Sequence, residues 1–204
     1  MEHYFTNNEN LKSEIREITY QTNDITLTFL SDNGVFSKNK IDYASKLLVE
    51  TFLKYHSKLE NELVLDVGGG YGFIGITLAS LTGATVEIID INKRAIHLCE
   101  RNIKLNEINN CKVYESNVYE NVLNKYKYII TNPPIRAGKM TVLQILAEAK
   151  EHLDEDGELW FVINKDQGAK STKKALEKWY NIEIVEKSKG FFVFRAKISW
   201  QISI

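Results

Sequence analysis

Two residue types are scarce in this 204-residue sequence, which contains two cysteines and two prolines. Cys99 and Cys111 lack the Cys-x-x-Cys spacing of a metal site, so we expect two reduced, packed thiols and no bound metal. The sequence also lacks the run of roughly 18 apolar residues that a membrane-spanning helix needs, and no early segment joins a basic start to an apolar stretch. We therefore expect a soluble, cytoplasmic protein without a membrane partner.

Neither sign of charge dominates, because 26 basic residues stand against 27 acidic ones. This balance gives no overall attraction to a polyanion, so a nucleic-acid partner would have to bind a local patch. One stretch, Lys165–Lys197, carries nine basic and four acidic residues. It is either a solvated face of ordinary helix and strand positions or, if it borders an active site, a nucleic-acid contact surface.

The length and the 44% hydrophobic content suit one globular domain, and no repeat or low-complexity linker interrupts the sequence. Alternating apolar and polar residues predict a β-hairpin over Glu14–Gln21 and Asp24–Leu30. Apolar residues at helical spacing predict a helix over Ile41–His56. We assign residues 1–57 to an N-terminal extension, formed by this hairpin and helix, that packs on a core domain of residues 58–204.

From Glu62 onward, short apolar runs rich in β-branched residues alternate with helical patterns. This alternation predicts an α/β fold with a doubly wound, mostly parallel sheet that helices cover on both faces. The last two runs are joined by Ser188-Lys189-Gly190 and should form an antiparallel hairpin. The seven expected strands are Leu63–Val67, Thr85–Asp90, Lys112–Glu115, Tyr128–Thr131, Glu158–Ile163, Ile182–Lys187 and Phe191–Ile198, and the expected helices are Gly72–Leu81, Lys93–Asn106, Val142–His152 and Ala169–Tyr180.

A glycine-rich segment, Gly68-Gly69-Gly70-Tyr71-Gly72, follows the first of these strands and precedes a helix. Glycine fits where the chain turns with positive φ and where a Cβ would stand between the backbone and a ligand. The helix start then offers N–H groups to that ligand. Asp66, just before the glycines, would favour a positively charged ligand over a pyrophosphate. Asp90, which ends the next strand, can accept hydrogen bonds from ribose hydroxyls or cap the following helix.

The segment Asp66–Gly72 resembles the Asp-x-Gly-x-Gly-x-Gly signature of class I S-adenosylmethionine-dependent methyltransferases. The resemblance implies a Rossmann-like fold, S-adenosylmethionine as the cofactor, a loop that holds its methionine part, and a ribose contact at Asp90. Asn117 stands where many relatives carry an acidic residue that binds the adenine amino group, and its side-chain oxygen can accept the same hydrogen bond without a charge. The cofactor contacts expected on this basis are Asp66, Gly68, Gly70, Gly72, Asp90, Ile91, Asn117, Val118 and Asn132.

The segment Asn132-Pro133-Pro134-Ile135 ends the strand beside this loop, at the carboxyl edge where open α/β sheets bind ligands. An exocyclic amino nitrogen on a base is a weak nucleophile because its lone pair is delocalised into the ring. The Asn132 side-chain oxygen and the Pro133 carbonyl can accept its two N–H groups, direct the lone pair at a methyl donor and stabilise the developing charge. We expect Asn132, Pro133, Pro134 and Ile135 to be catalytic, although Asn-Pro also ends strands as a simple turn.

The wider segment Asn132–Lys139 resembles a group of small ribosomal RNA methyltransferases that methylate the guanine N2 amino group in 16S ribosomal RNA. Two further signatures of that group have counterparts here. One resembles Gly34–Lys38 together with Ile41–Leu48, and the other resembles Lys165–Ala169. In relatives the first of these closes over the cofactor, which implies cofactor roles for Phe36, Ser37, Lys38 and Asp42. Two residues depart from the pattern of the group. Ala44 stands where relatives often have glycine, and Ile135 replaces an aromatic residue that stacks on the base in many amino-methyltransferases.

Arg136, Lys139 and Lys165 lie beside this expected site, where phosphate contacts would add affinity for ribosomal RNA or the small ribosomal subunit. A target base in structured RNA would have to leave its stack to reach Asn132. Other readings stay open: a protein glutamine or another nucleobase amine as target, or a non-catalytic cofactor- or RNA-binding module. Several such enzymes carry a second, degenerate copy of the domain, whereas this sequence has one copy, which implies a monomer or a homodimer.

Overall fold

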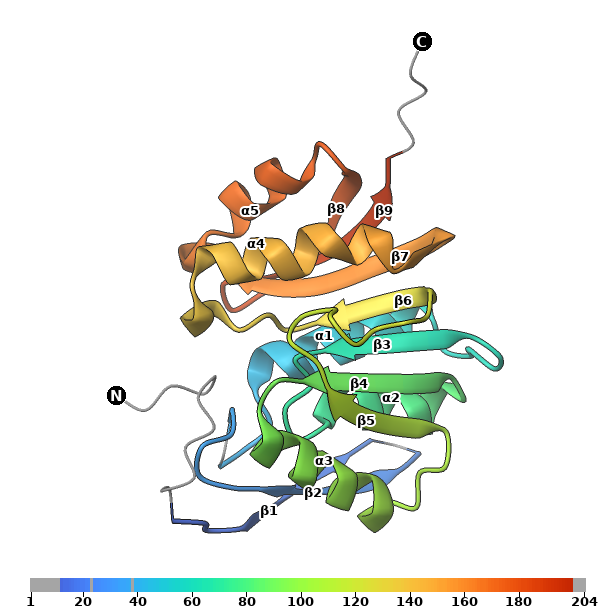
Figure 1. The fold of residues 1–204 in the computed structure, drawn as a ribbon, viewed down its shortest axis with the longest axis vertical. Helices are drawn as coiled ribbons and strands as arrows, with labels where there is room; N and C mark the ends of the chain where they lie inside the picture. The colour runs from blue at the N-terminus through green and yellow to red at the C-terminus, as the bar shows by residue number, and fades with distance from the viewer. Residues whose placement is uncertain (1–11, 23, 38, 200–204) are drawn as a thin grey trace.

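The computed structural model describes residues 12–22, 24–37 and 39–199, in which seven strands form one sheet. The strand order is β5-β4-β3-β6-β7-β9-β8. The chain therefore enters the sheet near its centre with β3, adds β4 and β5 on one side, and then crosses to β6 on the other side of β3. Figure 1 shows these strands stacked from β5 to β8 and β9. The strands are β3 Leu63–Val67, β4 Thr85–Asp90, β5 Cys111–Glu115, β6 Tyr126–Thr131, β7 Leu153–Asn164, β8 Tyr180–Ser188 and β9 Phe191–Ile198.

The direction of the strands confirms the doubly wound architecture that the sequence predicts. Strands β3 to β7 pair in parallel with their neighbours. Strand β9 runs antiparallel to both β7 and β8, which makes the expected C-terminal hairpin. Because the order of the strands reverses between β3 and β6, the carboxyl ends of these two strands mark the point where such sheets bind ligands.

Helices cover both faces of the sheet because side chains alternate along each buried strand. Within β3, Val64 belongs to one hydrophobic cluster and Leu65 to the other. The first cluster contains side chains of α1 (Tyr43–Tyr55), α2 (Phe73–Thr82) and α3 (Lys93–Leu105), and the second contains side chains of α4 (Lys139–Glu148) and α5 (Ala169–Leu176).

None of the helices in the described part of the chain has the length and apolar character of a transmembrane segment.

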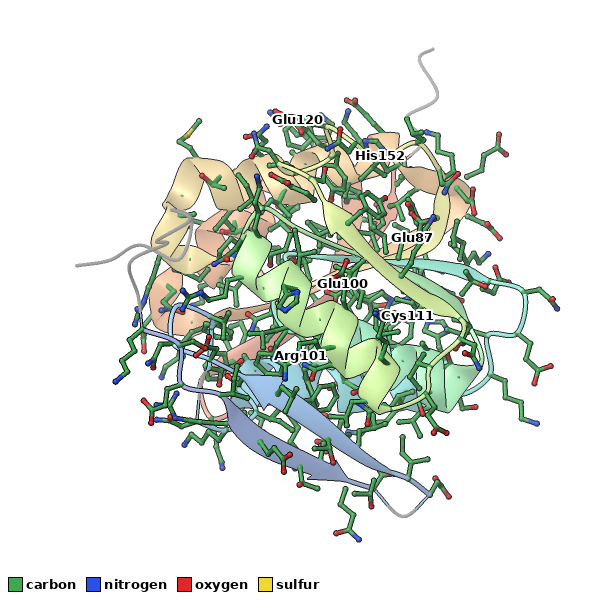
Figure 2. All side chains as sticks on the ribbon, turned by 60° about the horizontal axis from the view of Figure 1, so that its bottom comes forward. Glu87, Glu100, Arg101, Cys111, Glu120 and His152 are labelled. Carbon is green, nitrogen blue, oxygen red and sulfur yellow. The ribbon has the colours of Figure 1, made fainter. Side chains whose placement is uncertain are left out.

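The predicted N-terminal hairpin consists of β1 (Arg16–Gln21) and β2 (Thr26–Ser31), which pair antiparallel outside the main sheet. Its inward side chains belong to the same hydrophobic cluster as α2 and α3. In Figure 2, α3 lies in front of the sheet, marked by Glu100 and Arg101, with the hairpin next to it. The hairpin therefore packs on the core, while the boundary after residue 57 stays a prediction.

Asn102 of α3 and Asn106, which caps the C-terminus of that helix, pair with β2 much as a further strand would. The Asn102 side-chain oxygen accepts the Leu30 N–H (2.7 Å), and its N–H2 donates to the Leu30 carbonyl (3.0 Å). One turn later, Asn106 makes the same pair of bonds with Thr28, at 2.9 and 2.8 Å. Asn102 is fully buried and also donates to the Tyr71 carbonyl in the glycine loop, at 2.8 Å. This helix thus ties the hairpin to the loop.

Several element boundaries differ from those that the sequence predicts, and the three largest differences are in α5, β7 and α4. Helix α5 ends at Leu176 and not at Tyr180, because Tyr180 begins β8 and its hydroxyl donates to the Leu146 carbonyl of α4 (2.9 Å). Strand β7 begins at Leu153, ahead of a polar segment, because Leu153 pairs with Tyr126 of β6. Helix α4 spans Lys139–Glu148 and is followed by a 3₁₀ turn over residues 149–151, where the pattern predicts a helix over 142–152.

The two cysteines are free thiols in the core. Cys99 lies in α3 and Cys111 in β5, and burial raises the pKa of both, that of Cys111 to about 12. Both thiols are therefore protonated at neutral pH. Among the described residues, no group of three or more His, Cys, Asp or Glu side chains is arranged to hold a metal ion.

Candidate active site

The glycine loop joins β3 to α2 and has the conformation that its sequence predicts. Gly68 and Gly70 have positive φ angles of 71° and 60°. The N–H groups of Gly68 and Gly69 donate to the Ile89 carbonyl of β4, at 2.9 and 3.1 Å. A Cβ on Gly69 would lie 2.3 Å from the Ile88 side chain, whereas a Cβ on Gly68 would meet nothing within 4 Å. The loop is therefore packed against the sheet and open to a ligand at Gly68.

Asp66 lies behind this loop. Its side chain is fully buried, Oδ2 accepts the Gly75 N–H of α2 at 2.9 Å, and Oδ1 has no hydrogen-bond partner in the described part of the chain. Burial raises the pKa of Asp66 to about 7, helped by the charge of Asp90 and opposed by the bond from Gly75. Asp66 thus fixes α2 relative to β3, and its contact with a ligand stays a prediction.

Asp90 joins the glycine loop to the end of β4. Its Oδ2 accepts the Gly70 N–H at 2.9 Å, and its Oδ1 accepts the Asn92 N–H at 2.8 Å. The cap of α3 is Asn92, whose side-chain oxygen accepts the N–H groups of Arg94 and Ala95. The sequence allows two roles for Asp90. Asn92 and not Asp90 caps α3, and ribose binding by Asp90 stays a prediction.

Asn132 follows β6 and reaches the carboxyl edge of the sheet beside the glycine loop. The Thr131 hydroxyl donates to the Val67 carbonyl at 2.8 Å, which joins the ends of β6 and β3. The Asn132 side-chain N–H2 donates to Asp42 Oδ2 at 3.0 Å and to Ser45 Oγ at 2.9 Å. Because a carboxylate can only accept, these contacts decide which end of the Asn132 amide carries the nitrogen.

One pocket opens at this edge, between the glycine loop, the Asn-Pro-Pro segment and the start of α1. It brings together residues that are far apart in the sequence, at the crossing point between β3 and β6. All four predicted catalytic residues line it, as do Phe36, Asp42, Gly68 and Gly70 from the predicted cofactor set. The complete lining is Phe36, Asp42, Ala44, Ser45, Gly68, Gly69, Gly70, Tyr71, Phe73, Ile74, Asn132, Pro133, Pro134, Ile135, Arg136, Gln167 and Phe191.

The segment before α1 forms part of the mouth of this pocket. Phe36 is 51% exposed although it is a large apolar side chain. Ser37 has a φ of 56°, and its hydroxyl donates to the Lys40 carbonyl. Lys38, for which the resemblance implies a cofactor contact, lies outside the described residues.

The remaining predicted cofactor residues do not line the pocket. Gly72 caps α2 with a φ of 96°, and Ile91 is a half-exposed residue directly after β4. Exposed Asn117 follows β5, and its N–H2 donates to Glu120 Oε1 at 2.9 Å, so its oxygen is directed away from that carboxylate. Val118 has a φ of 51°, a conformation that β-branched residues rarely adopt.

One basic side chain lines the pocket, and further basic residues lie close to the lining in sequence. Arg136 is exposed and lines it, and exposed Lys139 begins α4 a few residues later. The N–H of exposed Lys165, after β7, donates to the carbonyl of the glycine between β8 and β9 (2.7 Å). At the tip of that hairpin, Lys189 Nζ lies 4.7 Å from the centre of the Tyr43 ring. The basic stretch that the sequence singles out therefore borders the site.

The structure adds pocket residues that sequence reasoning missed, among them Ser45, Tyr71 and Phe191. The spacing of Asp42 and Ser45 is that of a helix cap and its third residue, and Ser45 N–H does donate to Asp42 Oδ2 at 2.9 Å. That spacing predicts the cap but gives no sign of a contact with Asn132. The pKa of the Tyr71 hydroxyl is raised, mainly by burial and also by the negative charge of Asp42.

The family model for the methyltransferase small domain matches residues 26–195, a range that contains the glycine loop, Asp42 and the Asn-Pro-Pro segment. The chain belongs to the methyltransferase small domain family. The matched range contains every residue that lines the pocket.

This methyltransferase domain resembles two kinds of relative in sequence. It is 41% identical over 200 residues to the uncharacterized protein YbxB of Bacillus subtilis (strain 168), across 96% of this chain and 98% of that protein. It is 30% identical over 185 residues to the ribosomal RNA small subunit methyltransferase C of Vibrio cholerae, across 88% of this chain and 52% of that protein. The chain thus spans about half the length of the ribosomal RNA methyltransferases it matches.

Solved structures show the same fold. The Thermus thermophilus 16S rRNA N2 G1207 methyltransferase, RsmC, in complex with AdoMet and guanosine superposes with a TM-score of 0.83 at 23% identity, covering 93% of this chain and 52% of that one. The ribosomal protein L11 methylase of Lactobacillus delbrueckii subsp. bulgaricus superposes with a TM-score of 0.67 at 20% identity, covering 79% and 85%. At these identities the likeness establishes the architecture of the methyltransferase domain.

Proposed function

We propose that this chain is an S-adenosylmethionine-dependent methyltransferase that acts on an exocyclic amino nitrogen, namely guanine N2 in 16S ribosomal RNA. The observation that carries the proposal is that the glycine loop and Asn132–Ile135 are walls of one pocket. The names of the Vibrio cholerae and Thermus thermophilus relatives, the second solved with AdoMet and guanosine, favour this target over a protein glutamine or a DNA adenine.

The residues of the first wall fit the proposed cofactor. Bound there, S-adenosylmethionine supplies a methyl group on a positively charged sulfur. Gly68 leaves open space where any other residue would place a Cβ, so the loop backbone can approach a ligand closely. We assign the ribose to Asp90 and Ile91, and the adenine to Asn117 and Val118. Phe36 and Asp42 line the pocket, and we expect their segment, which in the sequence also contains Ser37 and Lys38, to close over the cofactor.

The residues of the second wall hold and activate the amino group. The Asn132 side-chain oxygen and the Pro133 carbonyl accept its two N–H groups, which orients the nitrogen lone pair toward the first wall. As the nitrogen gains a bond to carbon it becomes positive, and the same two oxygens stabilise that charge before a proton is lost to water. Pro134 keeps the segment rigid, and Ile135 offers a flat apolar contact to the base.

A transfer assay tests the proposal. The purified chain should move labelled methyl from S-adenosylmethionine to 16S ribosomal RNA or to small subunits, and nuclease digestion with mass spectrometry should yield N2-methylguanosine. Asn132→Ala should lower transfer roughly 100-fold or more without weakening cofactor binding. Asn109→Ala, an exposed asparagine in the turn before β5, is the matched control. Absence of transfer to RNA by a chain that binds the cofactor would refute the RNA target. Detection of a methylated glutamine or adenine as the product would identify a different target.

A further inference from the structure

The hydrogen bonds behind Asn132 assign a role to two residues that need not touch either substrate. Resting on the proposed function, we propose that Asp42 and Ser45 are positioning residues for methyl transfer. They hold the Asn132 amide with its oxygen toward the target amino group, and the Asp42 charge makes that oxygen a stronger acceptor.

Hydrogen bonds from Ser45 and Asn132 meet at one carboxylate oxygen of Asp42. Asp42 Oδ2 accepts three hydrogen bonds: from the Ser45 N–H (2.9 Å), the Ser45 hydroxyl (3.2 Å) and the Asn132 N–H2 (3.0 Å). Because the Ser45 hydroxyl gives its hydrogen to Asp42, its lone pair can accept from the Asn132 N–H2, at 2.9 Å. The Asn132 nitrogen therefore faces two acceptors, and each hydrogen bond has one possible direction.

Holding the nitrogen fixes the oxygen of the planar amide. The oxygen of Asn132 is turned away from Asp42 and Ser45, on a side chain that lines the pocket and is only half-buried. A free asparagine would rotate between orientations that present oxygen or nitrogen, and only the first can bind an amino group. Preorganisation of this kind removes the reorientation from the barrier to reaction.

The charge of Asp42 adds a second effect. A carboxylate that accepts from the Asn132 N–H draws electron density toward the amide oxygen, since hydrogen bonds in series polarise one another. The stronger oxygen matters most when the target nitrogen becomes positive, so the gain falls on the transition state more than on substrate binding. Ser45 is buried and Asp42 and Asn132 are half-buried, which limits the access of water to these bonds.

Two other roles for Asp42 lead to different results. It is the N-cap of α1, and a role confined to capping predicts a loss of stability with no special effect on transfer. A direct cofactor contact predicts weaker cofactor binding. Asp42→Ser separates these roles, because serine is an equally good N-cap yet is too short and lacks the charge to hold Asn132. Glu50→Gln, which removes an exposed negative charge from the same helix, is the matched control.

A nuclear magnetic resonance measurement tests the hydrogen bonds without cofactor or RNA. In protein labelled with ¹⁵N-asparagine, the side-chain N–H2 signals of Asn132 are identified by their loss in Asn132→Asp. In the wild type they should exchange slowly with water, and in Asp42→Ser they should shift and exchange at least tenfold faster. Unchanged Asn132 signals in Asp42→Ser would overturn the proposal.

Steady-state kinetics on ribosomal RNA test the consequence for transfer. Asp42→Ser should lower kcat roughly 100-fold, and Asp42→Asn, which keeps an acceptor without the charge, roughly tenfold. Because Asp42 lies in the segment expected to close over the cofactor, kcat is measured at saturating S-adenosylmethionine. The melting temperature of Asp42→Ser should stay at the wild-type value, as should kcat in Glu50→Gln. A wild-type kcat in Asp42→Ser at saturating cofactor would refute the positioning role, and a change confined to cofactor affinity would assign Asp42 a cofactor contact instead. If the wild type itself moves no methyl to RNA, the proposed function fails instead, while the Asn132 signals still report on the hydrogen bonds.

Discussion

Asp66 shows how one buried residue can make the stability of this domain depend on pH. Its carboxyl group has a pKa of about 7 in the folded protein, raised by burial, against a value near 4 in an unfolded chain. Between these values the folded protein holds a proton that the unfolded chain has released. The free energy of unfolding therefore falls as the pH rises from about 4 to 7, by at most about 1.4 kcal/mol per pH unit.

Asp66→Asn should remove this slope. Its amide oxygen can still accept the Gly75 N–H, but no proton is exchanged on unfolding. Relative to the wild type, the variant should gain roughly 2 kcal/mol in free energy of unfolding between pH 5 and pH 8, measured by urea denaturation without cofactor. Asp156→Asn, at an exposed carboxylate, should show no such gain. An equal difference from wild type at both pH values would contradict the raised pKa of Asp66.

At the scale of elements, one carboxylate joins α1, β7 and β9 on the first face of the sheet. Glu158 is 4% exposed. It accepts from His56 Nε2 (3.0 Å), Trp160 Nε1 (2.9 Å), Lys197 Nζ (3.2 Å) and the Arg195 guanidinium. Burial opposes its ionisation, yet these donors outweigh burial and hold the pKa of Glu158 well below its ordinary value. Its stabilising effect is present above about pH 4 and is lost as the pH falls further.

Glu158→Gln should lower the free energy of unfolding by about 3 kcal/mol at pH 7, because it leaves the partly buried Arg195 without its close partner. The control is Glu183→Gln. Glu183 contacts the same arginine, at 3.4 Å, but is exposed, so its loss should change stability by less than about 1 kcal/mol. Urea denaturation followed by circular dichroism measures both variants, and equal losses would show that burial of the pair is unimportant.

At the scale of the whole molecule, the near-zero net charge means that the proposed affinity for RNA has to come from basic residues at or near the pocket. Arg136→Gln with Lys139→Gln should weaken binding to 16S ribosomal RNA and lower the slope of log affinity against log salt by about 1 per residue. Cofactor affinity should not change. The control is Lys58→Gln, an exposed lysine before β3 at the opposite edge of the sheet. A salt slope that the double variant leaves intact would place the RNA surface elsewhere.

Sequence reasoning located each strand of the main sheet and the helices between them, but not all of their ends. The bounds of β3, β4 and β9 agree with the prediction because each is an apolar run that ends at a glycine, a polar residue or a turn. Helix α5 was predicted too long because Tyr180 fits helical spacing, and only its contact with α4 shows why it starts a strand instead. Such contacts are tertiary, so no local pattern reveals them.

The site shows the same division. The glycine loop and the Asn-Pro-Pro segment are each contiguous, and their chemistry is legible in the sequence. The contact between Asp42 and Asn132 joins residues 90 positions apart, and a helix cap gives no sign of its second partner. Which side chains share a pocket depends on how α1 lies on the sheet, and that follows from packing.

The pairing of α3 with β2 has a consequence for how this protein behaves in a crowded solution. A two-stranded sheet normally leaves unpaired N–H and C=O groups along its edges, and these can recruit a strand from another molecule. Here the amides of Asn102 and Asn106 occupy the backbone groups of Leu30 and Thr28 along one edge. A helix therefore closes an edge that a strand would otherwise have to close, and this side of the hairpin is protected against aggregation.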